Sequence, residues 1–271
     1  MRSYFLVITG FSMLSYQHMY HAGGLADVHK HAALSLMLAR ISEKPKPISY
    51  LETHAGRGLY DLGSAEAVKT GEAAQGIVPL IETGGLAPTH PYATAMEAVR
   101  ARHGAQFYPG SPLIARTLLR GDDKMHLCEL HPKEVSALQE TMARSAQIYQ
   151  ADGYAQVLRL SPPTPRRGFV LIDPSYEIKG EYEQAAEFIL ALHRKWSVAV
   201  VLLWYPLLER GLHALMLKQL RAAGLPNVWE QEVIFDAARK SRALGSGLFC
   251  VNAPYGIDAE LAQIPSLLQS L

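Results

Sequence analysis

The sequence predicts an α/β protein with a doubly wound, mostly parallel sheet that closes with an antiparallel strand pair. Three observations support this prediction. Strand-like apolar runs alternate with helical patterns along the chain. Residues 169–172 form a continuous apolar run, which is typical of a fully buried parallel strand. Asp173 and Pro174 end that run abruptly, at the kind of strand end where open α/β sheets bind their ligands.

Length and composition allow one such domain with a sizeable core. The chain has 271 residues, 49% of them hydrophobic, and a net charge of +1. This balance indicates neither a disordered chain nor a protein that coats nucleic acid. No run approaches the roughly 18 apolar residues of a membrane span, so we expect no membrane partner. Cys128 and Cys250 lie in apolar segments and are expected to be buried, reduced thiols of a cytoplasmic protein.

The start of the chain is expected to precede the folded domain. Residues 4–8 are apolar, but the run is short for a signal peptide and no small-residue cleavage pattern follows it. We therefore expect residues 1–12 to be an N-terminal extension and residues 13–271 to form the domain.

Residues 25–41 are expected to form the first helix. Its apolar residues follow the i, i+3, i+4, i+7 spacing of one helix face: Leu34, Met37, Leu38 and Ile41. Asp27, Lys30 and His31 continue the same face, so they must find partners or line a cavity. A metal site is the alternative interpretation of the nearby histidines, but no ligand pair accompanies a general base, and we predict none. These are His18, His21, His29, His31 and His54.

A strand and a glycine turn occupy residues 48–58. Gly56 and Gly58 let the backbone approach a ligand closely. A dinucleotide-binding turn would need a third glycine where the sequence has Asp61, which argues against a nicotinamide enzyme. The pattern Glu-x-x-x-Gly-x-Gly is similar instead to the first motif of S-adenosylmethionine-dependent methyltransferases.

The next acidic strand end comes later than expected. In a Rossmann-like fold an acid about 20 residues beyond the glycine turn holds ribose hydroxyls, but here the next candidate is Glu129, after the strand-like residues 125–128. Residues 60–106 carry helical patterns and no strong strand. We therefore expect these residues to form an inserted helical subdomain above the catalytic edge of the sheet.

The elements that flank Glu129 offer two further polar positions. Ser111 is expected to cap a helix that Pro112 begins, and its hydroxyl could also hold a carboxylate. A helix then starts near residue 131, and a strand over residues 147–151 ends in Asp152 and Gly153. An acid at this strand end could recognise an adenine amine, although Asp-Gly is also an ordinary turn.

The last third of the chain continues the alternation. A helix with one apolar face covers the region of residues 182–192, a buried strand spans residues 198–204, and a long helix is predicted over residues 207–223. Residues 228–235 and 248–252 read as a closing strand pair, separated by a basic loop.

The loop Asp173-Pro174-Ser175-Tyr176 carries the chemistry that we predict. It offers a carboxylate, a backbone carbonyl outside strand pairing and a flat ring, which together suit a planar group bearing an amine. The loop resembles the Asp-Pro-Pro-Tyr signature of methyltransferases that act on exocyclic amines, with Ser175 in place of the second proline. A strand followed by an ordinary turn is the alternative.

Several motifs, taken in order from residue 13 to near the C-terminus, resemble the RlmJ family of bacterial 23S ribosomal RNA adenine-N6 methyltransferases. They are Met13-Leu14-Ser15-Tyr16, His21-Ala22-Gly23, Ala26-Asp27-Val28, Lys30-His31, Thr53-His54-Ala55-Gly56-x-Gly58, Tyr108-Pro109-Gly110-Ser111-Pro112, Glu129-Leu130-His131-Pro132, Asp152-Gly153 and Asp173-Pro174-x-Tyr176.

The resemblance implies a Rossmann-like methyltransferase fold, S-adenosylmethionine as cofactor and 23S ribosomal RNA as substrate. We expect the protein to be a monomer. The resemblance further implies that the cofactor site includes Lys30, His31, His54, Ser111, Glu129, Asp152 and Gly153, and we add Gly56 and Asp173 to this predicted site. Asp173, Pro174 and Tyr176 would be catalytic, and Tyr16 and Tyr176 would touch the substrate. An enzyme that methylates DNA adenine or a protein amide, and a non-catalytic RNA-binding protein, remain the alternatives.

Overall fold

The computed structural model describes residues 17–236 and 243–269. The expected extension (residues 1–12), Tyr16 and residues 237–242 of the predicted basic loop lie outside the described residues. Within the described part, no helix is long and apolar enough to cross a membrane.

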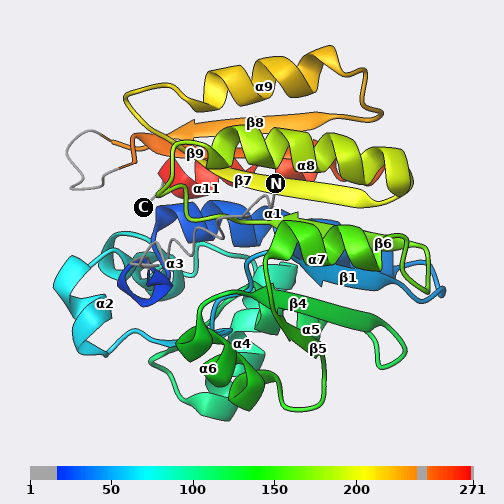
Figure 1. Ribbon diagram of the computed structural model, residues 1–271. Helices are drawn as coiled ribbons and strands as arrows, with labels where there is room; N and C mark the ends of the chain where they lie inside the picture. Colours follow the sequence, from blue (N-terminus) through cyan, green and yellow to red (C-terminus); the bar gives the residue numbers. More distant parts are fainter. Residues whose placement is uncertain (1–16, 237–242, 270–271) are drawn as a thin grey trace, which may run out of the picture.

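A seven-stranded sheet forms the centre of the structure, with strand order β5-β4-β1-β6-β7-β9-β8 (Figure 1). The five strands from β5 to β7 in this order are parallel, whereas β9 pairs antiparallel with both β7 and β8. This sheet confirms the predicted Rossmann-like fold with its C-terminal antiparallel pair. The bounds are β1 Ser49–Glu52, β4 Lys124–Glu129, β5 Gln147–Gln150, β6 Gly168–Ile172, β7 Val200–Leu207, β8 Trp229–Ile234 and β9 Gly245–Val251.

Helices cover both faces of the sheet, because successive side chains of its buried strands point to opposite sides. In β6, Phe169 and Leu171 join one hydrophobic cluster, and Val170 and Ile172 join the other. The first cluster includes α1 Leu25–Ser42, α5 Ser111–Leu118 and α6 Pro132–Met142, and the second includes α7 Gly153–Leu160, α8 Glu181–Lys195 and α9 His213–Ala222. The continuous apolar strand is therefore explained by burial on both faces.

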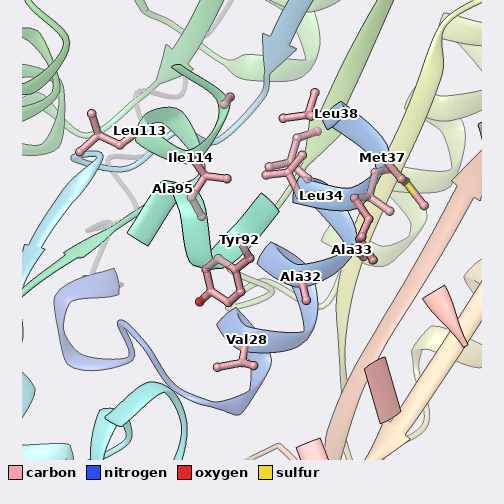
Figure 2. Close-up of a cluster of buried hydrophobic side chains, with 14 of the residues drawn as sticks. Val28, Ala32, Ala33, Leu34, Met37, Leu38, Tyr92, Ala95, Leu113 and Ile114 are labelled. Atoms are coloured by element: carbon pink, nitrogen blue, oxygen red, sulfur yellow. The ribbon is translucent and has the colours of Figure 1, made fainter. Parts of the chain in front are cut away.

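Helix α1 is buried along most of its length. Figure 2 shows Val28, Leu34 and Leu38 of α1 close to Tyr92 of α4 (Pro91–His103) and Ile114 of α5. On other sides α1 contacts β9 and the C-terminal helices α10 (Asp258–Leu261) and α11 (Ile264–Gln269). Its polar side chains are therefore held inside the protein, where each needs a partner.

The segment between β1 and α5 consists mainly of helices: α2 Ala65–Thr70, η2 Ala73–Gln75, α3 Ile77–Glu82 and α4. Its ends meet in a short antiparallel pair, β2 (Leu59–Asp61) with β3 (Phe107–Pro109), in which Tyr60 faces Tyr108. The sequence pattern does not predict β2, because a strand of three residues is too short to show alternation.

Two predicted helix starts are wrong. Strand β7 continues to Leu207, so the helix predicted from residue 207 begins only at His213, as α9. Beyond Leu203 the only described strand that pairs with β7 is β9. On its other side no described strand lies next to it there, so the strand tolerates Pro206, which has no backbone N–H to donate. Helix α5 starts at Ser111 itself, since Gly110 occupies the N-cap position with extended backbone.

Candidate active site

The predicted site residues follow the carboxyl ends of neighbouring strands. Asp152 comes after β5, Glu129 ends β4, His54 follows β1 and Asp173 follows β6. These four strands are parallel and adjacent in the sheet, so their carboxyl ends meet at one edge. The structure therefore brings side chains from four distant parts of the chain to a single edge of the sheet.

The glycine turn after β1 is tied to the end of β4. Gly56 has a positive φ of 60° and donates its N–H to Glu129 Oε2 at 2.8 Å. The other carboxylate oxygen of Glu129 accepts the His131 N–H at 2.8 Å. Burial raises the pKa of Glu129, and these backbone hydrogen bonds oppose the rise. The turn thus fixes the orientation of an acidic side chain that has further lone pairs to offer a hydroxyl group.

Asp152 and Gly153 begin helix α7. The Asp152 carboxylate accepts the Ala155 N–H at 2.8 Å and so caps the helix. Gly153 packs against the backbone at the end of β1, where a Cβ atom would lie 1.9 Å from the Thr53 carbonyl oxygen. Only glycine allows this approach, and it brings Asp152 next to the glycine turn.

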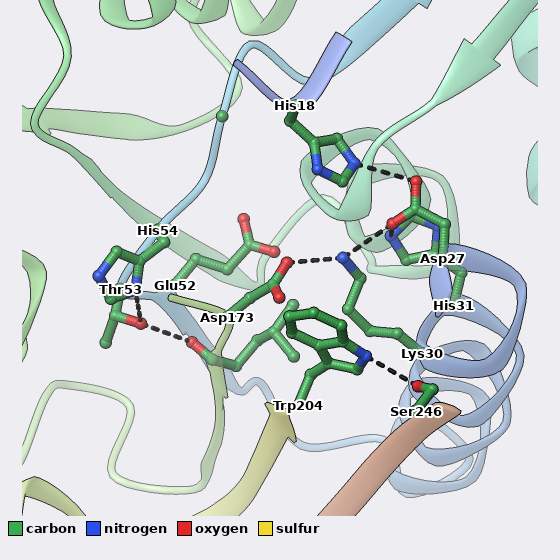
Figure 3. A network of polar contacts seen from close by, with 12 residues as sticks. His18, Asp27, Lys30, His31, Glu52, Thr53, His54, Asp173, Trp204 and Ser246 are labelled. Carbon is green, nitrogen blue, oxygen red and sulfur yellow. Dashed lines mark hydrogen bonds and ion pairs between the residues drawn. The ribbon is translucent and has the colours of Figure 1, made fainter. Parts of the chain in front are cut away.

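His54 is a partly buried, neutral histidine at the same edge. Burial lowers its pKa to about 4, although the charges of Asp173 and Asp152 favour protonation. Its Nδ1 forms a 2.8 Å hydrogen bond with Thr53 Oγ1 (Figure 3). Its ring meets Tyr154 edge-on. His54 is therefore fixed in place and lies in the field of both carboxylates.

Glu52, the last residue of β1, is fully buried and has a raised pKa. Burial raises its pKa to about 8, while hydrogen bonds from Tyr50 and Ser111 act in the opposite direction. The Tyr50 hydroxyl donates to Oε1 at 2.6 Å. Ser111 is buried, with 5% of its surface exposed, and its side chain does not cap the helix.

A chain of charged groups joins α1 to the end of β6 (Figure 3). Lys30 Nζ donates to Asp173 Oδ2 at 2.6 Å and to Asp27 Oδ1 at 2.9 Å. Asp27 Oδ2 also accepts from His18 Nε2 at 2.9 Å and from the Gly23 N–H at 3.0 Å. Burial works against ionisation of Asp27, but the charges of His18 and Lys30 hold its pKa well below the usual range. Lys30 is therefore a buried cation shared by two carboxylates.

His31 lies on the far side of Asp27 and belongs to a tyrosine cluster. Its Nδ1 and the Tyr108 hydroxyl are 2.6 Å apart, and the Tyr108 and Tyr92 hydroxyls are 2.7 Å apart. Burial lowers the pKa of His31 to about 3, so the ring is neutral. Among residues 17–236 and 243–269, no group of three His, Cys, Asp or Glu side chains gathers closely enough to hold a metal ion.

The loop after Asp173 places Tyr176 against the protein. Tyr176 has a positive φ of 55° and only 7% of its surface exposed. Its hydroxyl donates to the Trp204 carbonyl oxygen at 2.8 Å, and its ring packs against Tyr182 with a centroid distance of 4.3 Å. Tyr176 nevertheless lines the cavity described next.

A cavity of about 520 Å³ opens beside Asp173. Residues from α1, from the helical segment and from the ends of β6 and β7 line it, among them Lys30, Gln75, Asp173, Tyr176 and Trp204. His54, Ser111, Glu129 and Asp152 are not part of this lining. Asp173 therefore has the cavity on one side and the strand-end group with His54 on the other.

The strand-end residues fit the cofactor that the resemblance implies. S-adenosylmethionine combines cationic sulfonium and amino groups with an adenosine that offers hydroxyls and an amine. Glu52 Oε2 and the Tyr154 hydroxyl are buried and have no hydrogen-bond partner among the described residues. A cationic ligand beside a buried carboxyl favours its charged form. Glu129 and Asp152 add acceptors suited to hydroxyl and amine donors.

The sequence predicted no role in the site for Glu52, His18 or Trp204. For Asp27 it predicted only that the side chain must have a partner or line a cavity. Glu52 does stand in the Glu-x-x-x-Gly-x-Gly pattern, so the motif held a signal for it. Asp27 and His18 lie nine residues apart in the sequence, and only the fold shows that both contact one oxygen atom. Trp204 lies within the strand predicted over residues 198–204, and only the fold shows that it lines the cavity.

Comparisons with known proteins identify relatives of this chain. A family model described as "Ribosomal RNA large subunit methyltransferase D, RlmJ" matches residues 45–271. The chain is 36% identical to ribosomal RNA large subunit methyltransferase J of Escherichia coli over 95% of this chain and 94% of the relative, and 34% identical to the protein of that name from Haemophilus influenzae over 96% and 94%. A crystal structure of protein LPL1258 from Legionella pneumophila superposes with a TM-score of 0.84, at 32% identity, over 92% of this chain and 93% of that one.

Proposed function

The chain belongs to the RlmJ family of ribosomal RNA large subunit methyltransferases, which use S-adenosylmethionine, and on that premise we propose that it methylates the exocyclic N6 amine of an adenine in 23S ribosomal RNA. The family match covers most of the chain and includes the strand ends that carry the site. Direct transfer of the methyl group to the amine is the reaction that we assign to the Asp173 loop.

One observation carries this proposal: Asp173 separates two different environments. On one side are His54 and the acidic strand ends, which fit the cofactor. On the other side is a cavity lined by Asp173, Tyr176 and Trp204, which has the aromatic and acceptor groups that a base with an amine requires. A methyl donor and a base held on these two sides would meet at the carboxylate of Asp173.

The cofactor would be held by residues that the family resemblance and the geometry both point to. Glu129 would accept from the ribose hydroxyls, Asp152 from the adenine amine, and Ser111 with Lys30 or His31 would steady the methionyl end. Gly56 and Gly153 would let the backbone come close to the cofactor, with His54 beside it. When bound, the cofactor supplies an electrophilic methyl group.

Asp173 would act on the target amine by accepting its hydrogen bonds. The lone pair of the adenine amine is delocalised into the ring, which makes the amine a poor nucleophile. Hydrogen bonds to Asp173 Oδ1 and to the Pro174 carbonyl would favour a pyramidal nitrogen whose lone pair points away from the ring. Lys30 already occupies Oδ2, and no described residue donates to Oδ1. Positioning of this kind supplies about 7–11 kcal/mol in favourable cases.

The target adenine must be unpaired or flipped out of a helix, because a paired base cannot reach such a cavity. We place the base in this cavity, with Tyr176 in the cavity wall and Tyr16 as a further RNA contact. Residues 60–106 would act as a helical subdomain that closes the cavity, since Glu72 and Gln75 line it and Glu72 Oε1 lies 2.7 Å from His21 Nδ1. All these groups come from one chain, and we propose that the monomer is active.

The proposal is tested with purified protein, isotopically labelled cofactor and unmethylated 23S ribosomal RNA. Nucleosides from the product are separated and identified by mass spectrometry, with duplex DNA and intact large subunits as parallel substrates. N6-methyladenosine in the ribosomal RNA is the expected product. Methylation of DNA alone, or of another nucleoside, would contradict the assignment.

A further inference from the structure

Trp204 is an aromatic side chain of the cavity that the predicted motif does not include. It lies near the end of β7, next to the strand that carries Asp173. Its neighbours Leu203 and Tyr205 are fully buried, whereas Trp204 is partly exposed and lines the cavity together with Asp173. A large ring left open beside a charged group is poor core packing but a suitable surface for a planar base.

Tyr176, the aromatic side chain of the cavity that belongs to the predicted motif, exposes less of its surface. Tyr176 is 7% exposed, and Tyr182 packs against its ring. The rings of Tyr176 and Trp204 meet at 63° with centroids 5.9 Å apart, so they form a corner in which a flat group can face only one of them. Lys30 Nζ lies 5.6 Å from the Trp204 ring centroid. The ring therefore lies beside the ammonium group that binds Asp173.

A chain of hydrogen bonds fixes the orientation of the Trp204 ring. Trp204 Nε1 donates to Ser246 Oγ at 2.9 Å (Figure 3), and Ser246 Oγ lies 2.8 Å from His29 Nδ1. His29 Nε2 is 3.1 Å from Gln231 Oε1, and Gln231 Nε2 donates to the Leu261 carbonyl oxygen at 2.9 Å. The chain therefore runs from the cavity through β9, α1 and β8 to helix α10.

Each donor in this chain has one acceptor. The amide of Gln231 donates to a carbonyl, so its oxygen must accept the proton of His29 Nε2. Burial lowers the pKa of His29 to about 4, and a neutral ring that donates from Nε2 accepts at Nδ1. Ser246 then donates to His29 and accepts from the indole N–H, which can only donate. The ring of Trp204 has one preferred orientation as a result.

We propose that the indole of Trp204 contacts the target base directly, and that Ser246 and His29 are positioning residues that hold the indole in the cavity wall. This inference rests on the proposed function and adds a residue to it. Contacts between a base and an aromatic ring change binding by roughly 5- to 150-fold when the ring is removed. Truncation of Trp204 should therefore weaken the interaction with RNA and leave the affinity for the cofactor unchanged.

The test compares Trp204→Leu and Trp204→Phe with the parent enzyme, and Trp229→Phe serves as a control on β8 outside the cavity. Methylation kinetics give kcat and KM for ribosomal RNA, and calorimetry gives the Kd of S-adenosylmethionine. We expect Trp204→Leu to lower kcat/KM for RNA by about 5- to 150-fold and Trp204→Phe to lower it less, with cofactor Kd within twofold of the parent. If Trp204→Leu does not fold, Trp204→Met takes its place.

The positioning role is tested with Ser246→Ala in two backgrounds. With Trp204 present, Ser246→Ala should lower kcat/KM for RNA by several-fold. In the Trp204→Phe background it should have no further effect on kcat/KM, because the indole N–H is already gone. Equal effects in both backgrounds would overturn the positioning role, and unchanged kcat/KM in Trp204→Leu would overturn the contact itself. A parent enzyme that makes no N6-methyladenosine would instead refute the proposed function.

Discussion

The ammonium group of Lys30 lies 2.6 Å from Asp173 Oδ2 and joins helix α1 to the loop after β6. The side chain of Lys30 is 4% exposed and that of Asp173 15%, so water weakens this ion pair little. Asp27 binds the same ammonium at 2.9 Å and is itself buried. The proposed catalytic carboxylate is thus held by a residue of the first helix of the domain.

Replacement of Lys30 tests whether this contact orients Asp173. Lys30→Met leaves Asp27 and Asp173 buried without their shared cation, and removal of one partner of a buried pair typically costs about 3–5 kcal/mol in the free energy of unfolding. We also expect kcat to fall by more than KM for RNA rises. Chemical denaturation and steady-state kinetics measure the two effects. The exposed Lys133→Met serves as the control, and equal behaviour of both variants would contradict the orienting role.

Two histidines with lowered pKa values predict a loss of stability in acid. Burial lowers the pKa of His29 and of His54 to about 4, below the ordinary value of 6.5. Between these values the unfolded chain binds more protons than the folded protein, so the free energy of unfolding falls as the pH drops from 6.5 to 4. Each group contributes a slope of up to about 1.4 kcal/mol per pH unit. Urea titrations across this range should show a shallower slope in His29→Gln.

Glu52 predicts the opposite trend, over a pH range that overlaps that of the histidines and extends to about 8. Its pKa is raised from 4.5 to about 8, so the folded protein binds this proton more tightly than the unfolded chain. Its contribution to the free energy of unfolding therefore falls as the pH rises from 4.5 to 8. Glu52→Gln should remove this contribution and be the more stable protein at pH 8. A variant with the same pH profile as the parent would show that Glu52 ionises normally.

Gly153 tests the close approach of α7 to β1. A methyl group there would lie 1.9 Å from the Thr53 carbonyl oxygen, so Gly153→Ala must displace the start of α7 together with Asp152. We expect a loss of about 1–3 kcal/mol in the free energy of unfolding and weaker cofactor binding. Gly121→Ala is the matched control, because a Cβ at Gly121 meets no atom within 4 Å. Calorimetric titration of both variants with S-adenosylmethionine measures the difference.

Much of the sheet could be predicted from sequence because its strands are buried on both faces and end in polar residues. Phe169 to Ile172 followed by Asp173 combine both signals, and the helix spacing of Leu34 to Ile41 is equally regular. Cys128 and Cys250 are buried free thiols, as expected. Strand β7 runs past its apolar core because pairing with β9 continues beyond Leu203, which no local pattern records.

The polar contacts of the site could be predicted less well, because most of them join distant parts of the chain. His29 and Ser246 are 217 residues apart in sequence, and Lys30 and Asp173 are 143 apart. Local spacing shows that Lys30 lies on a core-facing stripe, but not which carboxylate it meets. Local pattern can also mislead. Ser111 is a residue type that often caps helices, but here Gly110 is the N-cap and Ser111 is the first residue of the helix.

The most direct test of the central claim replaces Asp173 and asks what happens to one nucleoside. Unmethylated 23S ribosomal RNA is incubated with S-adenosylmethionine and either the parent enzyme, Asp173→Ala or the exposed control Asp122→Ala, and N6-methyladenosine is then measured by mass spectrometry. We predict that the parent and Asp122→Ala form it, and that Asp173→Ala still binds the cofactor but is at least about 100-fold slower. N6-methyladenosine formed by Asp173→Ala at the parental rate would contradict the account.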